Sequence, residues 1–296
     1  MRVAVTGSHG LIGSALLDHL AAHGHDAVRI VRSEPAAGEI GWDPASGRLD
    51  PAALAGVDAV VNLAGAGIGD HRWTDDYKRK VRESRTVGTR VLAEAVAACD
   101  EGPKVLLSGS AVGYYGDRGD EVLDETSAPG DGFLASVARD WEAATAPADH
   151  AGARVVHLRT GIVLAEEGGA LAKMVPLFKF GLGGRFGSGR QWMSWISIED
   201  EAEAIIHLLT SDVAGPVNLT APEPVTNAQL ADTIGDVLRR PTVVPVPSFG
   251  PKLLLGGERA GALLLEGQRV LPRVLQADGY EFAHPTLERA LRAAIG

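Results

Sequence analysis

The chain has 296 residues, of which 45% are hydrophobic and 22% charged. This composition is typical of a globular protein that buries a substantial core in one large domain or two modest ones. The formal net charge of −10 argues against a nucleic-acid partner and against an anionic membrane surface, because both attract basic proteins. Cys99 is the only cysteine, which excludes an intrachain disulfide and a cysteine-based zinc cluster.

Three further features bear on location and partners. The first residues predict a strand rather than a secretory signal, and the apolar stretch 57–68 is broken by polar residues and glycines, so we expect a cytoplasmic protein with no membrane partner. The pair His23 and His25 has no nearby carboxylate or cysteine cluster, so we expect no metal site. The apolar segment 253–265 predicts packing within the C-terminal region or against a second copy in a homodimer.

The N-terminal residues predict a strand, a glycine-rich turn and a helix. Residues 2–6 are apolar and β-branched, and apolar residues then recur at helical spacing as far as Gly24, a typical helix C-terminal glycine. Glycines between a strand and a helix allow a tight turn and a close approach to a pyrophosphate, which the helix N-terminus attracts. We therefore predict a dinucleotide-binding turn, the alternative being a glycine turn without a ligand. The predicted contacts are Gly7, Gly10, Leu11, Ile12 and Gly13.

The second predicted strand, residues 27–31, is followed by Arg32. At this strand end of a dinucleotide-binding fold, an acidic residue binds the ribose 2′-hydroxyl, whereas an arginine accommodates a 2′-phosphate. The nearest acidic residue, Glu34, comes two residues later. We therefore predict NADP(H) rather than NAD(H) as the cofactor. The alternative is that Arg32 is an exposed residue at the beginning of a loop.

A third strand is predicted within residues 58–65, and a long helix over 75–98. We place Leu63, Ala64 and Gly65 in the cofactor site, because small residues at this strand end let a ring or ribose lie against the backbone. Arg85 lies on the otherwise apolar face of the helix. Because burying an unpaired arginine is costly, we expect it to contact a cofactor phosphate, the glycine turn or a helix neighbour in a salt bridge.

Two more strands are predicted at residues 104–108 and 154–159. Ser110 and Tyr114 follow the first of them, and hydroxyl groups at such a position suit a site that hydrogen-bonds a carbonyl or an alcohol, so we predict both as catalytic. Arg159 ends the second strand, and we place it in the cofactor site. The repeated alternation of strands and helices predicts an α/β fold with a doubly wound parallel sheet.

Together these motifs resemble the extended or atypical short-chain dehydrogenase/reductases of the nucleoside-diphosphate-sugar epimerase-like type. The matching segments are the glycine turn, 62–65, 110–116, 158–164, 195–200 and 215–218. Residues 181–195 and 264–272 further resemble a subfamily called epimerase family proteins, which has a short C-terminal module.

The resemblance implies a Rossmann-type sheet and a smaller C-terminal substrate-side domain. We predict a dinucleotide-binding domain at residues 1–165, its sheet completed by about 196–221. Residues 166–195 and 223–296 would form the smaller domain, with the proline-rich segment 241–251 as the linker to the terminal module.

The resemblance also implies a catalytic serine and a Tyr-x-x-x-Lys pair on the helix after the fourth strand, the tyrosine acting as general acid and base. Ser110 matches the serine. Alignment places Phe133 or Leu134 at the tyrosine position and Val137 or Ala138 at the lysine position. None of these four side chains has a proton to donate, so the usual mechanism cannot operate on them.

Three interpretations follow from the missing pair. The first is an enzyme with a rearranged site, in which Ser110 acts with Tyr114 or Tyr115. The second is a reductase that needs little acid–base help, and the third is a non-catalytic NADPH-binding sensor or scaffold that signals through a protein partner. The intact cofactor turn and the site hydroxyls favour an NADP(H)-binding, epimerase-like oxidoreductase or isomerase acting on a small carbonyl, alcohol or sugar nucleotide.

The segment 181–190 combines five glycines with Arg185 and Arg190. Backbone amides and arginines in such a loop are able to clasp an anionic substrate such as a sugar nucleotide. The alternative is a loop that crosses between domains.

Overall fold

The computed structural model describes residues 1–242, 246–247, 249, 253 and 256–296. The proline-rich linker predicted at 241–251 therefore falls largely outside the described residues. Within them, no helix combines the length and the apolar character needed to cross a membrane.

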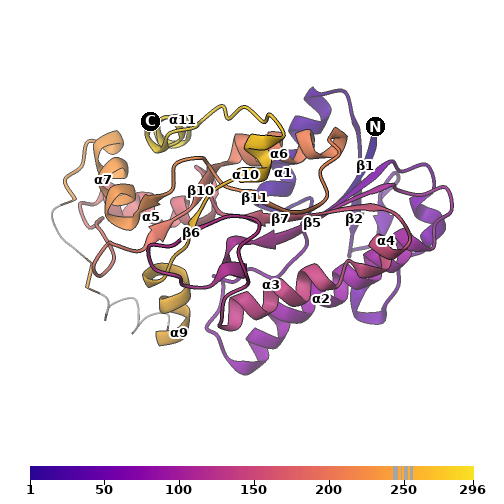
Figure 1. The fold of residues 1–296 in the computed structure, drawn as a ribbon, viewed down its shortest axis with the longest axis horizontal. Coiled ribbons are helices and arrows are strands. Elements are labelled where there is room, and N and C mark those ends of the chain that lie inside the picture. The colour runs from indigo at the N-terminus through magenta and orange to yellow at the C-terminus, as the bar shows by residue number, and fades with distance from the viewer. Residues whose placement is uncertain (243–245, 248, 250–252, 254–255) are drawn as a thin grey trace.

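A seven-stranded sheet forms the centre of the molecule, with its strands in the order β11-β7-β5-β4-β1-β2-β3 (Figure 1). Every neighbouring pair in it is parallel. The strands are β1 (Arg2–Thr6), β2 (Asp26–Val31), β3 (Ile40–Gly41), β4 (Ala59–Asn62), β5 (Val105–Ala111), β7 (Arg154–Thr160) and β11 (Gly215–Leu219). This topology confirms the predicted α/β fold with a doubly wound parallel sheet.

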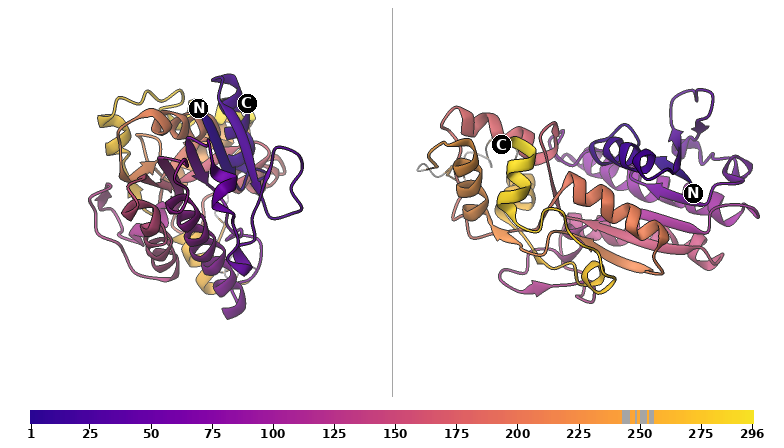
Figure 2. Two further views of the ribbon diagram at one scale, coloured as in Figure 1. Left: turned by 90° about the vertical axis from the view of Figure 1, so that its right-hand side faces the viewer. Right: turned by 90° about the horizontal axis from the view of Figure 1, so that it is seen from above.

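Helices cover both faces of the sheet, as Figure 2 shows from two further sides. Alternate residues of β1 divide between two apolar cores, because side chains of a strand point to opposite faces in turn. Val3 and Val5 pack in one core and Ala4 in the other. The flanking helices are α1 (Leu11–Ala22) and α6 (Ile198–Thr210) on one face and α2 (Asp75–Ala97), α3 (Phe133–Ala143) and α4 (Ala146–His150) on the other.

Two strand assignments differ from the sequence analysis. β5 continues to Ala111 instead of ending at residue 108, because its last residues pair with β7 as far as Thr160. Ser110 consequently lies inside a strand. The segment 34–56, to which no strand is assigned above, contributes the edge strand β3, which pairs with β2 over only two residues.

The C-terminal part of the chain gathers at the carboxyl ends of the strands (Figure 1). A third apolar core, separate from the two that flank the sheet, unites α5 (Gly169–Lys179), α7 (Asn227–Leu238) and α11 (Leu287–Ile295) with β8 (Ile162–Ala165) and β10 (Trp195–Ser197). Farther along, β13 (Arg269–Val270) pairs with β6 (Val122–Leu123), and α9 (Gly257–Ala260) precedes the π-helical turn Gly261–Leu265.

Two contacts fasten the C-terminal residues to earlier parts of the chain. Gly267 packs so closely on Trp192 that a Cβ at residue 267 would overlap the Trp192 carbonyl oxygen. On the other side, the buried Asp200 carboxylate accepts hydrogen bonds from the amides of Ala283 at 2.7 Å and His284 at 3.0 Å. The first contact holds residue 267 beside Trp192, and both residues line the cleft described below.

Candidate functional site

A cleft of about 680 Å³ opens at the carboxyl ends of the strands, between the glycine turn and the C-terminal region. Of the predicted site residues, it is lined by Gly7, Gly10, Leu11, Ile12, Gly13, Leu63, Arg85 and Ser110. The predicted residues Arg32, Ala64, Gly65, Tyr114 and Arg159 are not among its lining residues. In the described part of the chain, no group of three or more His, Cys, Asp or Glu side chains is arranged to hold a metal ion.

The glycine turn is built for close backbone contact. Gly7 has φ +65°, and a Cβ at this position would lie 2.7 Å from the carbonyl carbon of Leu63. A Cβ on Gly13 would overlap the carbonyl oxygen of Gly7. Only glycine therefore allows β1, α1 and the end of β4 to come together here.

The N-terminus of α1 faces the cleft without a side-chain cap. Gly10 is its N-cap residue, no side chain accepts a hydrogen bond from its first turn, and that turn contains no acidic residue. Leu11 and Ile12 of this turn line the cleft. Uncapped amides at the positive end of a helix dipole form an anion-binding site, which fits a pyrophosphate.

Two arginines come from β2 or directly follow it, and one of them is close to the glycine turn. Arg32 directly follows β2 and is exposed, and its contact with a 2′-phosphate stays a prediction. The guanidinium of Arg29, also on β2, lies 3.5 Å from Nε2 of His9 in the turn. Neither arginine forms an ion pair within the described residues. Arg29 and His9 were missed by the sequence analysis, although a histidine between the glycines and an arginine three residues before Arg32 are visible signals.

Arg85 reaches the cleft from α2. Its guanidinium donates to the carbonyl oxygens of Ala66 at 2.9 Å and Val81 at 3.1 Å, and it lies 5.0 Å from the ring centre of Trp141. Gly65 leaves room for it, because a Cβ there would be 3.1 Å from the guanidinium carbon. No described carboxylate pairs with Arg85, so the salt bridge to a helix neighbour is absent, and burial lowers its pKa to about 10.

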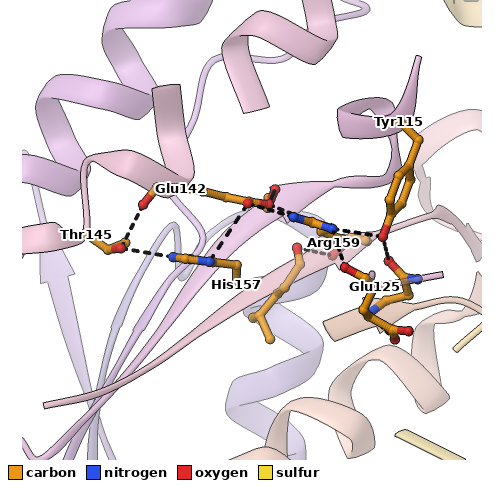
Figure 3. Close-up of polar contacts among 10 residues, drawn as sticks. Tyr115, Glu125, Glu142, Thr145, His157 and Arg159 are labelled. Carbon is orange, nitrogen blue, oxygen red and sulfur yellow. Dashed lines mark hydrogen bonds and ion pairs between the residues drawn. The ribbon is translucent and has the colours of Figure 1, made fainter. Parts of the chain in front are cut away.

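The Ser110 hydroxyl is hydrogen-bonded to a buried ion pair formed by Glu142 and Arg159. Its hydroxyl donates to Oε1 of Glu142 at 2.7 Å. Arg159 donates to both oxygens of the same carboxylate, from Nε at 2.8 Å and from Nη2 at 2.9 Å (Figure 3). Arg159 is only 3% exposed, and its positive charge is neutralised by the Glu142 carboxylate. The structure therefore corrects the prediction for Arg159, which belongs to the support of Ser110 and does not reach the cofactor cleft.

The two tyrosines also belong to this support. The ring of Tyr114 covers the Arg159 guanidinium at 3.6 Å. The hydroxyl of Tyr115 donates to Oδ1 of Asn218 at 2.7 Å and accepts from Arg159 at 3.0 Å, and burial raises its pKa to about 12. Neither tyrosine lines the cleft, so the predicted pairing of Ser110 with Tyr114 or Tyr115 as cleft hydroxyls is not formed.

Two further groups complete the network drawn in Figure 3. Nδ1 of His157 lies 3.9 Å from the Glu142 carboxylate, and its Nε2 shares a hydrogen bond with the Thr145 hydroxyl at 2.9 Å. Burial lowers the pKa of His157, which favours the neutral ring. Glu125 accepts from the Asn218 amide at 3.0 Å, and burial raises the pKa of its carboxyl.

Apolar side chains occupy the positions of the missing tyrosine and lysine. Phe133 and Val137, on the first turns of α3, both line the cleft. The Phe133 ring packs edge-on against Trp73, with ring centres 5.2 Å apart. The ammonium of Lys78 lies 5.3 Å from the Phe133 ring but is paired with Glu258.

The glycine-rich segment 181–190 lies elsewhere. Arg185 and Arg190 are exposed and are not among the cleft residues. The segment packs on the start of α7, where Asn227 accepts a hydrogen bond from the Phe186 amide at 2.7 Å. The predicted clasp for an anionic substrate is therefore not formed in the cleft, because backbone bonds to α7 direct this loop away from it.

Comparison with known proteins places this geometry in a family. The profile of the NAD dependent epimerase/dehydratase family matches residues 3–220, and that of a domain of unknown function, DUF1731, matches residues 246–294. Epimerase family protein ML0860 of Mycobacterium leprae is 49% identical over 294 residues, which cover 99% of this chain and 95% of that protein.

Two solved structures are similar over the whole chain. The human epimerase family protein SDR39U1, in a crystal structure with NADPH, has a TM-score of 0.91 at 39% identity and covers 99% of both chains. A nucleoside-diphosphate sugar epimerase from Corynebacterium glutamicum has a TM-score of 0.83 at 38% identity, and the match covers 100% of this chain and 58% of that one. As the sequence motifs predicted, the chain belongs to the NAD dependent epimerase/dehydratase family.

Proposed function

We propose that the protein is an NADP(H)-dependent oxidoreductase that acts on a carbonyl or an alcohol in the cleft. The observation that carries the proposal is the uncapped N-terminus of α1. It lies beside a glycine turn so tightly packed that a Cβ on Gly7 or Gly13 would overlap backbone atoms. Arg85 supports it as a second, independent feature, because a buried guanidinium without a carboxylate partner is suited to an anion. The NADPH in the structure of human SDR39U1, at 39% identity, supports the same cofactor.

Each part of the cofactor has candidate residues. The turn from Gly7 to Gly13 presents backbone amides to the diphosphate. Arg32 and Arg29 are the candidate cations for a 2′-phosphate, and His9 lies within hydrogen-bond distance of Arg29. Leu63 lines the cleft and Arg85 lies beside Gly65, so the end of β4 is the candidate surface for the ring or ribose. When bound, the nicotinamide donates or accepts a hydride.

Ser110 is the candidate residue for the reacting oxygen. Because its hydroxyl donates to Glu142, its oxygen is left to accept a hydrogen bond in the cleft. In the oxidative direction, the alcohol carbon loses a hydride and the alcohol oxygen loses a proton. That proton moves to Ser110 Oγ as the serine's own proton moves to Glu142, which leaves the carbonyl product. Arg159 positions Glu142 for this role.

Cofactor choice is tested by titrating NADPH and NADH against the wild-type protein and Arg32→Ala. We expect the wild type to prefer NADPH, and the variant to lose about tenfold in NADPH affinity while NADH affinity is unchanged, because one charge-assisted bond to phosphate is removed. Arg90→Ala, an exposed arginine on the outer part of α2, is the matched control. Equal affinity for both cofactors in both proteins would reject the assignment.

A specific observation also favours a second function, a non-catalytic NADPH sensor that signals through a protein partner. Phe133 and Val137 remove the usual proton donor from the cleft. The enzyme proposal expects NADPH oxidation with a carbonyl substrate and its loss in Ser110→Ala. The sensor alternative expects tight NADPH binding, no turnover with any substrate, and a protein partner that is recovered only with cofactor present.

A further inference from the structure

This inference rests on the proposed function and concerns the class of substrate. Beyond the glycine turn, the wall of the cleft is mainly apolar. α3 contributes Phe133, Leu134 and Val137, and Trp73, Met193 and Leu263 come from other segments. Val137 and Met193 are buried, at 4% and 5% exposed. Covering the exposed part of such a wall with an apolar ligand lowers the free energy, because apolar surface is removed from water.

The charged side chains that line the cleft are mostly acidic. Asp117, Asp131, Glu258 and Glu266 contribute carboxylates, and among the described lining residues Arg85 is the only basic one. Glu258 is neutralised by Lys78, whereas the other three carboxylates form no ion pair within the described part of the chain.

Two of these carboxylates already repel each other. Burial raises the pKa of Glu266, and the negative charge of Asp117 raises it further. A ligand that carries a diphosphate would add two like charges to this region, which Coulomb repulsion and the cost of removing phosphate from water both oppose.

The arginines that the sequence suggested for an anionic substrate do not line this part of the cleft. Arg85 lies against Gly65 and the Ala66 carbonyl, on the side assigned to the cofactor. Arg185 and Arg190 lie on the segment that packs against α7 and do not line the cleft. Recognition of a phosphate normally uses such arginines or a helix N-terminus.

We propose that the substrate is a carbonyl compound, or the corresponding alcohol, with an apolar body and no phosphate group. A nucleoside-diphosphate sugar is then excluded by the charge of the cleft, although the family fold is associated with such compounds. The C-terminal segment 257–268 acts in this specificity, because it supplies Glu266 and Leu263.

The test uses the full-length protein saturated with NADPH, and it measures ligand binding through energy transfer from tryptophan to NADPH. Trp73 and Trp192 line the cleft, so a ligand that enters it changes this signal. Uncharged aryl and alkyl aldehydes and ketones are compared with UDP-glucose. We expect at least one uncharged carbonyl to bind about tenfold more tightly than UDP-glucose. The proposal is overturned if UDP-glucose binds as tightly, or if no uncharged carbonyl binds.

A double variant, Asp117→Asn with Glu266→Gln, tests the cause. Removing two charges is expected to tighten UDP-glucose binding by about tenfold. The affinity for the uncharged carbonyl should stay within about twofold of the wild-type value. Glu94→Gln, an exposed carboxylate on α2 outside the cleft, is the matched control. An unchanged UDP-glucose affinity in the double variant rejects the electrostatic argument. NADPH affinity is measured first, so failure of the cofactor assignment is distinguished from failure of the substrate class.

Discussion

At the scale of single residues, the site depends on one buried charge pair. Glu142 accepts hydrogen bonds from Ser110 and from both ends of the Arg159 guanidinium. A buried ion pair gains little over an apolar replacement of the whole pair, but removal of one partner leaves an uncompensated charge. The pair therefore determines where Ser110 points more than it determines how stable the protein is.

Glu142→Gln is expected to lower the free energy of unfolding by about 3 to 5 kcal/mol, because Arg159 would remain buried without a counter-charge. Urea denaturation followed by circular dichroism measures it. Asp140→Asn is the control, since it breaks the more exposed pair of Asp140 with Arg82 and should cost about 1 kcal/mol or less. Equal losses in the two variants would contradict the role of burial.

Residue types alone identified Ser110 but not its partner. The sequence displays the serine in a motif near the end of a predicted strand, although β5 in fact continues past it. Glu142 lies 32 residues further along and meets Ser110 only because α3 packs beside β5. Arg159 looked like a cofactor ligand for a similar reason. Its position at a strand end is visible in the sequence, whereas the carboxylate that neutralises it comes from another element.

At the scale of elements, the turn between β1 and α1 is the most constrained part of the cleft. Gly13 has no room for a Cβ, which would overlap the Gly7 carbonyl oxygen. Gly24, just after α1, has φ +73° but nothing within 4 Å of an added Cβ. The two glycines are therefore required for different reasons, the first for contact and the second for backbone conformation.

Gly13→Ala is expected to lower NADPH affinity by at least about tenfold, because the turn must shift away from the position that presents its amides. Fluorescence titration of NADPH measures it. Gly24→Ala should retain wild-type NADPH affinity and lose about 1 kcal/mol of stability, because its strain is local. If both variants bind NADPH normally, the turn is not the diphosphate site.

Elements with a strong local signal were predicted well. The strands at 2–6 and 27–31 and the helix over 75–98 match β1, β2 and α2 within one or two residues. β3 was missed because two residues carry no periodicity, and its pairing with β2 alone makes it a strand. The extension of β5 to Ala111 was missed because β7 provides the hydrogen bonds.

At the scale of the whole molecule, a carboxyl group buried between the sheet and α6 makes the stability of the protein depend on pH. Glu201 is fully buried, and it accepts a hydrogen bond from the Thr160 hydroxyl at 2.8 Å. Its other oxygen has no partner among the described residues. Burial raises the pKa of this carboxyl from 4.5 to about 8.

The folded protein therefore binds a proton at Glu201 that the unfolded chain releases above pH 4.5. The resulting stability is fully present below pH 4.5 and is lost as the pH rises to about 8. Over this range, the wild type is expected to lose up to about 5 kcal/mol relative to Glu201→Gln. Urea denaturation at a series of pH values measures the difference.

Glu94→Gln, at an exposed position, is the control and should keep the wild-type pH profile. A constant difference between wild type and Glu201→Gln would contradict the burial of an ionisable carboxyl.

The sequence by itself determined the α/β class, the order of the main strands and helices, the glycine turn and the loss of the Tyr-x-x-x-Lys pair. These features depend on local periodicity, on residue volume and on which side chains carry a proton. All three are properties of residues that are close together in the sequence. Only the tertiary structure decided the partners of Ser110, Arg85 and Arg159, the position of the 181–190 loop and the acidic character of the cleft. Each of these depends on contacts between residues far apart in the chain, and their charges and burial are defined only once the elements pack together.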